Sequence, residues 1–399
     1  MTLAKRFLFI TTNNLATNPR LVKELKLAEK NGYETTVILF NLANWSDKLD
    51  KDLQTSFSTT KFIQLSATSS PFWPWVLSSI AEKLLRFLPV NWLNTSMLSI
   101  STGKRSYLLQ KTIRDISCSY DWVVAHNPAS FYPALQAAKK TGALLGIDVE
   151  DYHPGETNDG KLASVIKRLM QMVLPKAAYC SYAAPLIMAE VKKDIPNLQQ
   201  NQIVILNGFD ESEFLPPQII DKVPLQLVWY SQNINFKRGL ENIIPVVNKL
   251  YPSVELNLIG NLSYEFEKEY LKNKIGIVLH GIKSQKELHH CLSIFDIGLA
   301  IDIPVDRNRE LALTNKIIAF AQAGLFIVAT HTRAQDIFLA DSEVNYRQMD
   351  NTKSAIENLL NELYNKKNEL RKSKIEQYAN GRKYDWHRLV KPVLNIWQN

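Results

Sequence analysis

The chain has 399 residues, of which 46% are hydrophobic and 22% are charged, and its formal net charge is +8. Such a chain can bury a large core and divides into two domains of about 200 residues each. The positive charge fits nucleic acid, an anionic membrane surface or an anionic small ligand. No basic run with interleaved aromatic residues occurs, so we expect no nucleic-acid partner.

The cysteines and the N-terminal segment indicate the compartment. Cys118, Cys180 and Cys291 are odd in number and lack the spacing of a zinc site, which favours a reducing environment. The apolar run at residues 7–10 is too short for the core of a signal peptide. We therefore expect a cytoplasmic protein.

Apolar strands and amphipathic helices alternate along the chain. The pattern predicts strands at residues 7–10, 35–40, 122–125, 143–147, 178–182, 203–206, 225–230, 255–259, 277–279, 294–301 and 325–329. It predicts helices at residues 19–31, 104–117, 132–140, 162–172, 239–251, 264–273 and 285–292. This alternation predicts an α/β fold with parallel sheets that carry helices on both faces. We expect the proline-rich, acidic segment 209–224 to link two such domains.

One further helix points to a nucleotide. Its polar start carries Lys316, it stops at Gly324, and the loop 302–313 leads into it from the preceding strand. Amide donors and the positive end of the helix dipole favour phosphate at such a place. Ligands of parallel sheets bind beyond the carboxyl ends of the strands, which are expected here at Thr11, Ala125, Asp148, Ser231, Gly260 and Asp302.

Residues 71–93 are rich in aromatic side chains and include Trp73, Trp75 and Trp92. Lys83, Arg86 and three prolines interrupt this stretch, so it cannot form a membrane-spanning helix of about 20 apolar residues. Tryptophans beside basic residues suit a helix that lies in the lipid interface. The alternatives are an amphipathic helix that packs on its own domain and a dimer contact.

Six short elements resemble those of a known family and occur in the same order. They are Thr-Asn-Pro-Arg-Leu at 17–21, Trp-Val-Val-Ala-His-Asn at 122–127, Asp-Val-Glu-Asp at 148–151, Asn-Gly-Phe-Asp at 207–210, Thr-Asn-Lys through Ala-Gly at 314–324, and Tyr-Asp-Trp at 384–386. This series resembles the "group 1" family of retaining glycosyltransferases with the GT-B fold.

The resemblance implies two Rossmann-like domains that face a central cleft. Residues 1–206 would form an acceptor domain, 207–383 a nucleotide-sugar domain, and 384–399 a helix that crosses back to the first domain. No Asp-x-Asp triplet is present to hold a divalent metal. We therefore expect no metal and no cofactor beside the nucleotide-sugar co-substrate.

The sequence departs from the family in one catalytic motif. Members carry Glu-x7-Glu, and Ala319 occupies the position of the second Glu. Either Glu310 substitutes for the first Glu after a small loop shift, or the motif is absent.

A second departure concerns the donor signature Gly-Arg … Lys-Gly, which reads Ser231-Gln232 … Arg238-Gly239. The resemblance places Arg238 where the family has its phosphate-binding lysine. A leaving diphosphate needs cations or amide donors in a site that excludes water. The predicted donor-binding residues are Ser231, Gln232, Arg238, Gly281, Ile282, Asn315 and Lys316.

The predicted catalytic and acceptor residues lie mainly in the first half. His126 follows an apolar strand, and its ring is expected to project from the strand end, where the resemblance implies contact with the donor sugar. Glu310 is the second catalytic candidate. The predicted acceptor-binding residues are Asn13, Asn14, Arg20, Asp148, Glu150 and Asp151.

The sequence thus predicts a glycosyltransferase that moves a hexose-type sugar to a hydroxyl with retention. Its expected setting is cell-surface or lipid-linked glycan synthesis, in the cytoplasm or on the inner face of a membrane. A nucleotide-sugar 2-epimerase and a non-catalytic nucleotide- or sugar-binding relative are the alternatives. The base, sugar, acceptor, linkage and oligomeric state remain open.

Overall fold

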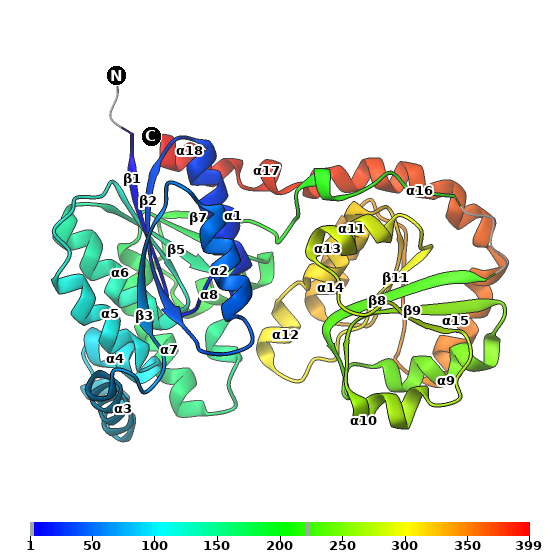
Figure 1. Ribbon diagram of the computed structural model, residues 1–399, viewed down its shortest axis with the longest axis horizontal. Helices are drawn as coiled ribbons and strands as arrows, with labels where there is room; N and C mark the ends of the chain where they lie inside the picture. The colour runs from blue at the N-terminus through cyan, green and yellow to red at the C-terminus, as the bar shows by residue number, and fades with distance from the viewer. Residues whose placement is uncertain (1–3, 220–223) are drawn as a thin grey trace. The chain divides into compact units, whose positions relative to one another are not determined.

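The computed structural model describes residues 4–219 and 224–399, and the chain divides into two compact units (Figure 1). The first unit comprises Met1–Ile205 with Ile396–Asn399, and the second comprises Leu206–Asn395. Each unit is built on its own parallel sheet.

The first unit contains a seven-stranded parallel sheet with the order β3-β2-β1-β4-β5-β6-β7. The interior of its central strands is fully buried, as the continuous apolar runs require of a sheet that helices cover on both faces. The strands are β1 (Arg6–Thr11), β2 (Glu34–Asn41), β3 (Lys61–Ser66), β4 (Trp122–His126), β5 (Leu144–Val149), β6 (Tyr179–Tyr182) and β7 (Asn201–Val204).

Apart from α2 and α5, the α-helices of the first unit start at side-chain caps or prolines. Asn18 accepts a hydrogen bond from the amide of Leu21, and Pro19 occupies the first helical position, where no amide donor is needed. The helices are α1 (Pro19–Lys30), α2 (Asp47–Ser56), α3 (Phe72–Phe87), α4 (Thr95–Thr102), α5 (Arg105–Arg114), α6 (Pro128–Thr141), α7 (Gly160–Val173) and α8 (Pro185–Asp194), with 3-10 turns η1 (Val90–Trp92), η2 (His153–Gly155) and η3 (Leu174–Lys176).

The last residues of the chain complete the core of the first unit. The Trp397 side chain is fully buried, its Nε1 donates to the Tyr179 hydroxyl at 3.1 Å, and its ring lies 4.9 Å from that of Phe7. The Lys5 ammonium donates to the carbonyls of Trp397 and Gln398, each at 2.8 Å. Residues 396–399 thus pack within the first unit, whereas residues 384–395 of the expected crossing helix belong to the second unit.

The second unit contains a six-stranded parallel sheet with the order β10-β9-β8-β11-β12-β13. Its strands are β8 (Leu225–Ile234), β9 (Val254–Leu262), β10 (Ile277–Leu279), β11 (Ile297–Ala300), β12 (Phe326–Ala329) and β13 (Tyr346–Gln348). Its α-helices are α9 (Leu240–Leu250), α10 (Tyr264–Phe266), α11 (Gln285–Leu292), α12 (Arg307–Leu311), α13 (Asn315–Gln322), α14 (Arg333–Asp341), α15 (Lys353–Asn365), α16 (Lys367–Gly381) and α17 (Trp386–Leu389). It also contains the π-helical turn η5 (Glu267–Leu271) and the 3-10 turns η4 (Glu211–Glu213) and η6 (Arg382–Tyr384). The last helix of the chain is α18 (Lys391–Gln398).

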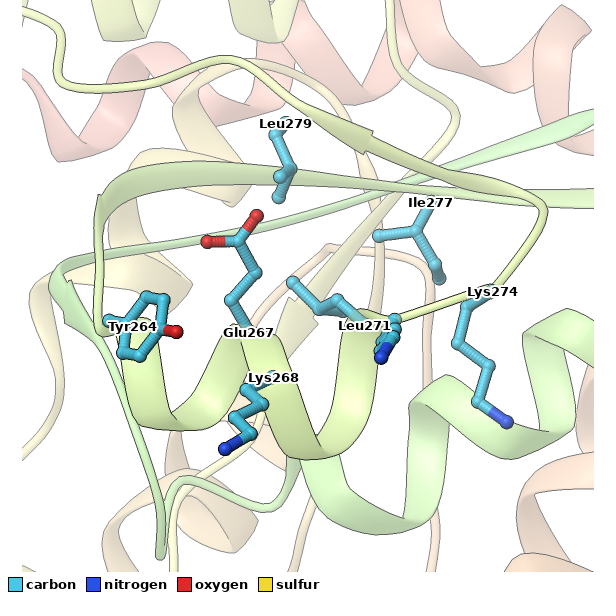
Figure 2. A pocket seen from close by; sticks show the side chains of 8 residues that line it. Tyr264, Glu267, Lys268, Leu271, Lys274, Ile277 and Leu279 are labelled. Carbon is cyan, nitrogen blue, oxygen red and sulfur yellow. The ribbon is translucent and has the colours of Figure 1, made fainter.

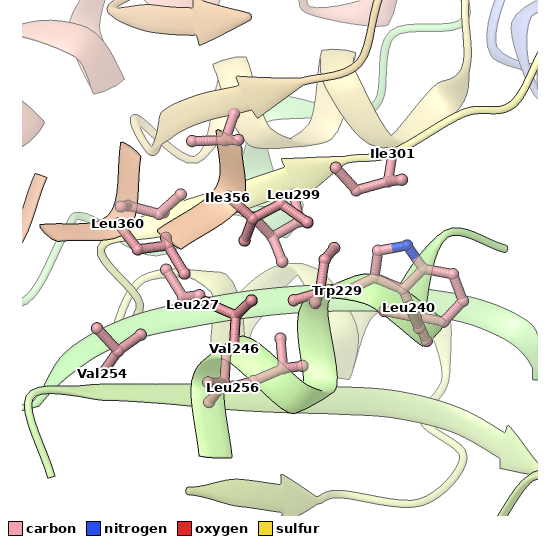
Figure 3. Close-up of a cluster of buried hydrophobic side chains, with 14 of the residues drawn as sticks. Leu227, Trp229, Leu240, Val246, Val254, Leu256, Leu299, Ile301, Ile356 and Leu360 are labelled. Carbon is pink, nitrogen blue, oxygen red and sulfur yellow. The ribbon is translucent and has the colours of Figure 1, made fainter. Parts of the chain in front are cut away.

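The core of the second unit forms between one face of this sheet and helices α9 and α15 (Figure 3). Leu227 and Trp229 of β8 and Leu256 of β9 are completely buried there, together with Leu240 at the start of α9 and Ile356 of α15. Each such side chain contributes about 1.5–3 kcal/mol when it leaves water. This core fixes the carboxyl end of β8.

Several strands and loops differ from the sequence-based expectation. His126 and Asp148 lie within β4 and β5 rather than beyond them. Ser231 and Gln232 were expected after a strand end, but β8 continues through them to Ile234. The expected loop 302–313 contains helix α12.

The segment expected to link the two domains lies within the second unit instead of between the units. Segment 209–224 belongs to the second unit, and its residues 220–223 lie outside the described residues.

Candidate functional site

Lys316 lies at the carboxyl edge of the second sheet, in the first turn of α13. Its ammonium is 3.9 Å from the Asp302 carboxylate, which follows β11, and 5.2 Å from the centre of the Trp229 ring on β8. Only 15% of the Lys316 side chain is exposed. Lys316, which was predicted to bind phosphate, is therefore held between the start of α13, the residue Asp302 that follows β11, and the middle of β8.

Two further cations act on this ammonium. Burial lowers the pKa of Lys316, the Asp302 carboxylate opposes this, and the positive charges of Arg238 and Arg309 lower it further. Arg238 precedes α9, and Arg309 lies in α12. We call Arg238, Arg309 and Lys316 the cationic cluster. Like charges that gather around a partly dehydrated ammonium repel one another, and a bound anion would relieve this repulsion.

Unpaired polar atoms accompany the cationic cluster. Among the described residues, Trp229 Nε1, Tyr230 OH, Thr314 Oγ1 and Asn351 Oδ1 are buried without a hydrogen-bond partner. Thr314 precedes α13, and its hydroxyl makes no capping bond to the first amides of that helix. The Tyr230 ring is 5.5 Å from Phe320 of the same helix. An unpaired buried polar atom costs about 1–3 kcal/mol, so these atoms favour a polar ligand.

The remaining donor candidates take two positions. Asn315 is exposed at the start of α13, close to Lys316 in the chain. Ser231, Gln232, Gly281 and Ile282 lie along β8 and after β10. Gly281 accepts a hydrogen bond from the amide of Gly260 at 2.9 Å, and 77% of Ile282 is exposed. No contact described for the second unit joins these four residues to the cationic cluster, and their donor role stays a prediction.

The two positions of the glutamate motif have different surroundings. Glu310 in α12 is half-buried, and its Oε2 accepts a hydrogen bond from the Arg333 amide at 3.2 Å, at the start of α14. Glu310 thus caps a neighbouring helix, and its catalytic role stays a prediction. Ala319 is completely buried in α13. The position that carries a glutamate in the family therefore faces the core in this protein.

The first unit brings four predicted or neighbouring residues into a buried charge network, which we define as Arg20, Glu24, His126 and Asp148. The Arg20 guanidinium grips the Asp148 carboxylate with two bonds of 2.7 and 2.6 Å. His126 Nε2 lies 3.0 Å from Glu24, and its Nδ1 lies 3.5 Å from Asp148. All four side chains are at most 2% exposed.

His126 and Asp148 are both charged at neutral pH. Burial disfavours the imidazolium, but Glu24 and Asp148 outweigh it and raise the pKa of His126 to about 10. Burial likewise disfavours the Asp148 carboxylate, but Arg20 and His126 outweigh it and lower its pKa well below the usual range. His126 therefore stands protonated and bonded inside the unit, and its predicted contact with a sugar stays a prediction.

Arg20 and Asp148 were predicted to bind the acceptor, and both are closed off from solvent. Arg20 also donates to the carbonyl of Ile205, and Asp148 accepts from the Ser181 hydroxyl at 2.6 Å. The Arg20–Asp148 pair therefore connects α1 and β5 to Ser181 of β6 and to Ile205, which follows β7. Their observed partners are protein groups, and their acceptor role stays a prediction.

The other acceptor candidates surround the ends of β1 and β5. Asn14 is buried and donates to Ser46, whereas Asn13 is half-buried and accepts from Arg105 at 3.3 Å. Glu150 and Asp151 follow β5 and are half-buried. Burial raises the pKa of Glu150 to about 7, Arg20 opposes this, and Asp151 adds to it. Glu150 thus titrates in the range that suits proton transfer.

Arg105 and Arg309 are site candidates that the sequence analysis missed. Arg105 donates to the carbonyl of Thr12 at 2.6 Å, and its guanidinium lies 5.6 Å from the Phe40 ring centre. Burial lowers the pKa of Arg105. Both arginines follow loops without a recognisable motif, and only the folded strand ends bring them beside the other candidates.

A separate hollow lies between η5 and the edge strand β10 (Figure 2). The Glu267 carboxylate points toward Leu279, whereas the ammonium groups of Lys268 and Lys274 point away from it. The hollow is lined by Tyr264, Glu267, Lys268, Leu271, Lys272, Lys274, Ile277 and Leu279. None of the predicted site residues lines it, so we do not assign it to the site.

Comparison with solved structures identifies the architecture. The chain is similar to Anabaena HepE in complex with UDP, at 14% identity and a TM-score of 0.67, with 98% of this chain and 99% of that chain covered. A glycosyltransferase from Rickettsia africae matches at 16% identity and 0.66, covering 99% and 98%. The chain has the GT-B fold.

Sucrose-phosphate synthase from Thermosynechococcus elongatus shares this fold as well, with 11% identity, a TM-score of 0.66, and 99% and 98% of the two chains covered. No family model and no curated protein sequence matches the chain. In the described part of the chain, no group of three or more His, Cys, Asp or Glu side chains is placed to hold a metal ion. Metal independence stays a prediction.

Proposed function

We propose that this protein is a glycosyltransferase that transfers a hexose-type sugar from a nucleotide-sugar to a hydroxyl group with retention. The observation that carries the proposal is the position of Lys316 beside Asp302 and the Trp229 ring at the edge of the second sheet, within a GT-B fold, and the charges of Arg238 and Arg309 act on it. HepE, which shares the fold, has been crystallised with UDP, with UDP and glucose, and with UDP-glucose. We expect the nucleotide-sugar to bind the second unit.

The cationic cluster supplies what departure of a diphosphate requires. When the glycosidic bond breaks, negative charge grows on the phosphate oxygens, and fixed cations stabilise it most where water is excluded. The arginines can grip phosphate with two parallel bonds, whereas the largely buried Lys316 acts as a point charge. The amides at the start of α13 add donors, since the Thr314 side chain does not occupy them.

The first unit would handle the acceptor. Glu150 titrates near neutral pH and lies at the end of β5, so we assign it the removal of the proton from the acceptor hydroxyl. Asp148 lies in β5, the strand that precedes Glu150, and Arg20 binds Asp148, so both act as positioning residues. His126, by the resemblance, would contact the sugar. We assign the acceptor to cell-surface or lipid-linked glycan synthesis on the cytoplasmic side.

A thermal-shift panel with UDP-, GDP-, ADP- and CMP-linked sugars tests the donor site, because a bound ligand stabilises the native state by mass action. One nucleotide class should raise the melting temperature, and Arg238→Ala should weaken this response by about tenfold or more in affinity. Arg347→Ala removes an exposed arginine of the same unit as a control. Equal affinity in the Arg238 variant would refute the assigned donor site.

Product analysis with the donor so identified tests the reaction. Transfer with retained anomeric configuration supports the proposal. Conversion of the donor without any acceptor indicates an epimerase. Tight binding without turnover indicates a non-catalytic relative, which the buried Ala319 in the glutamate position would then explain.

A further inference from the structure

Helix α3 carries a row of large apolar side chains that point into solvent. Trp73, Leu77, Ile80, Leu84 and Phe87 are between 49% and 82% exposed, and we call them the apolar stripe. A helix advances by about 100° per residue, so these five positions fall within an arc of about 80°. Exposed apolar residues that are scattered singly need no explanation, but a continuous row of this kind marks an interaction surface.

The opposite side of α3 is fixed to the first unit. Ser78 is buried there, and the Lys104 ammonium lies 4.8 Å from the ring centre of Trp75 and donates to the Ser79 hydroxyl. The Arg86 guanidinium donates to the carbonyl of Ser101 at 2.9 Å. The helix is therefore held from behind by α4 and its neighbours, and the stripe stays outward.

The chain segment that contains α3 is strongly basic. From Phe57 to Arg114 the chain has seven basic residues and one acidic residue, a net charge of +6 within a chain whose total is +8. The single carboxylate, Glu82, pairs with Arg86 at 2.8 Å. Lys83 is exposed beside the stripe. The stripe thus belongs to a strongly basic segment of the chain, and the exposed Lys83 directly precedes Leu84 of the stripe.

We propose that the apolar stripe docks on an anionic lipid surface, with α3 lying in the plane of the interface. Tryptophan is favoured at the boundary between headgroups and acyl chains, and Trp73 of the stripe and Trp92 of η1 are 70% and 75% exposed. A second copy of this chain would bring the same positive charge to the contact and be repelled by it, and a protein partner without excess negative charge would gain nothing from it. No helix among the described residues is long and apolar enough to cross a membrane.

Vesicle flotation with the full chain tests this surface, and it needs neither donor nor acceptor. We expect binding to vesicles of phosphatidylcholine with about one-third phosphatidylglycerol, and much weaker binding to phosphatidylcholine alone. The double variant Leu84→Glu, Phe87→Glu should lower the partition coefficient by about tenfold or more, since it removes two apolar anchors and adds two negative charges. Ile375→Glu alters a 60% exposed residue of α16 and should bind as wild type.

The outcomes separate a lipid surface from a second copy of this chain as the occupant of the stripe. Lipid docking is supported if the double variant loses vesicle binding with an unchanged melting temperature while the wild type and Ile375→Glu still bind. Absent binding by the wild type, equal binding by the double variant, or equal binding to both kinds of vesicle overturns it. Self-association without lipid that the double variant abolishes would instead assign the stripe to a second copy of the chain.

Discussion

The Nε2 atom of His126 lies 3.0 Å from the Oε2 atom of Glu24, and both side chains are buried. Burial lowers the pKa of His126, but Glu24 and Asp148 outweigh it and raise this pKa to about 10. The pKa of a histidine in an unfolded chain is about 6.5. Because the folded-state pKa is the higher one, the stabilisation is complete below about pH 6.5 and is lost as the pH rises through about 10. This relationship gives the first prediction.

Over that window the wild type should lose about 1.4 kcal/mol of unfolding free energy for each pH unit relative to His126→Gln, which lacks the titrating ring. Urea unfolding of both proteins between pH 6 and 10 measures this difference. His331→Gln changes a 54% exposed histidine and should follow the wild-type profile. Parallel profiles for wild type and His126→Gln would show that His126 does not hold a buried charge.

Asp148 neutralises two buried cations, so its removal should be costly. Asp148→Asn leaves Arg20 and His126 without their shared carboxylate and should destabilise the first unit by about 3–5 kcal/mol. Lys193→Ala breaks an exposed ion pair with Glu190 and should cost less than about 1 kcal/mol. Denaturant midpoints measure the loss of unfolding free energy in both variants. A loss in Asp148→Asn as small as that in Lys193→Ala would contradict the role of Asp148 in neutralising Arg20 and His126.

Arg309 should contribute to donor binding although no motif marks it. Its charge acts on the Lys316 ammonium, so a diphosphate that neutralises Lys316 should also gain from Arg309. Arg309→Ala should weaken binding of the stabilising nucleotide by about tenfold, measured by calorimetry. Arg347→Ala again serves as the exposed control. An unchanged dissociation constant in Arg309→Ala would show that Arg309 does not contribute to donor binding.

Glu150 should set the pH dependence of the reaction. Its pKa of about 7 means that the carboxylate forms as the pH rises through neutrality, so kcat/KM should increase through about pH 7 and then level off. Glu150→Gln should lose activity and this rising limb together. The same limb in the variant would assign the ionisation to another group.

Gly324 should tolerate no side chain. Its φ is +72°, and an added Cβ would lie 2.6 Å from the carbonyl of Lys374 and 2.7 Å from the amide of Tyr378. Gly324→Ala should therefore destabilise the second unit by about 1–3 kcal/mol in thermal unfolding. Gly32 has a φ of +73° and open space around it, so Gly32→Ala should cost clearly less.

The sequence was informative where burial is continuous. Apolar runs predicted β1, β2, β4 and β8, because a parallel strand that is covered on both faces is apolar at nearly every position. It missed α2 and β3, because Asp50 is the only buried residue of α2 and none of β3 is fully buried. Edge elements of this kind carry no strong apolar pattern.

The site was predicted in part for the same physical reason. Helix and strand ends are local features, so Lys316 could be placed at the edge of the second sheet, and the structure confirms that position beside Asp302. The partner of His126 could not be predicted, since Glu24 lies 102 residues away and only the sheet order brings α1 against β4. Long-range pairing of charges leaves no local signal.

The burial of Trp397 sets the order in which the protein can finish folding. During synthesis, Phe7 and Tyr179 leave the ribosome long before the indole that packs against them, and the whole second unit is made in between. The N-terminal unit must therefore wait, with part of its core uncovered, until the final residues arrive, which departs from the usual domain-by-domain sequence of events.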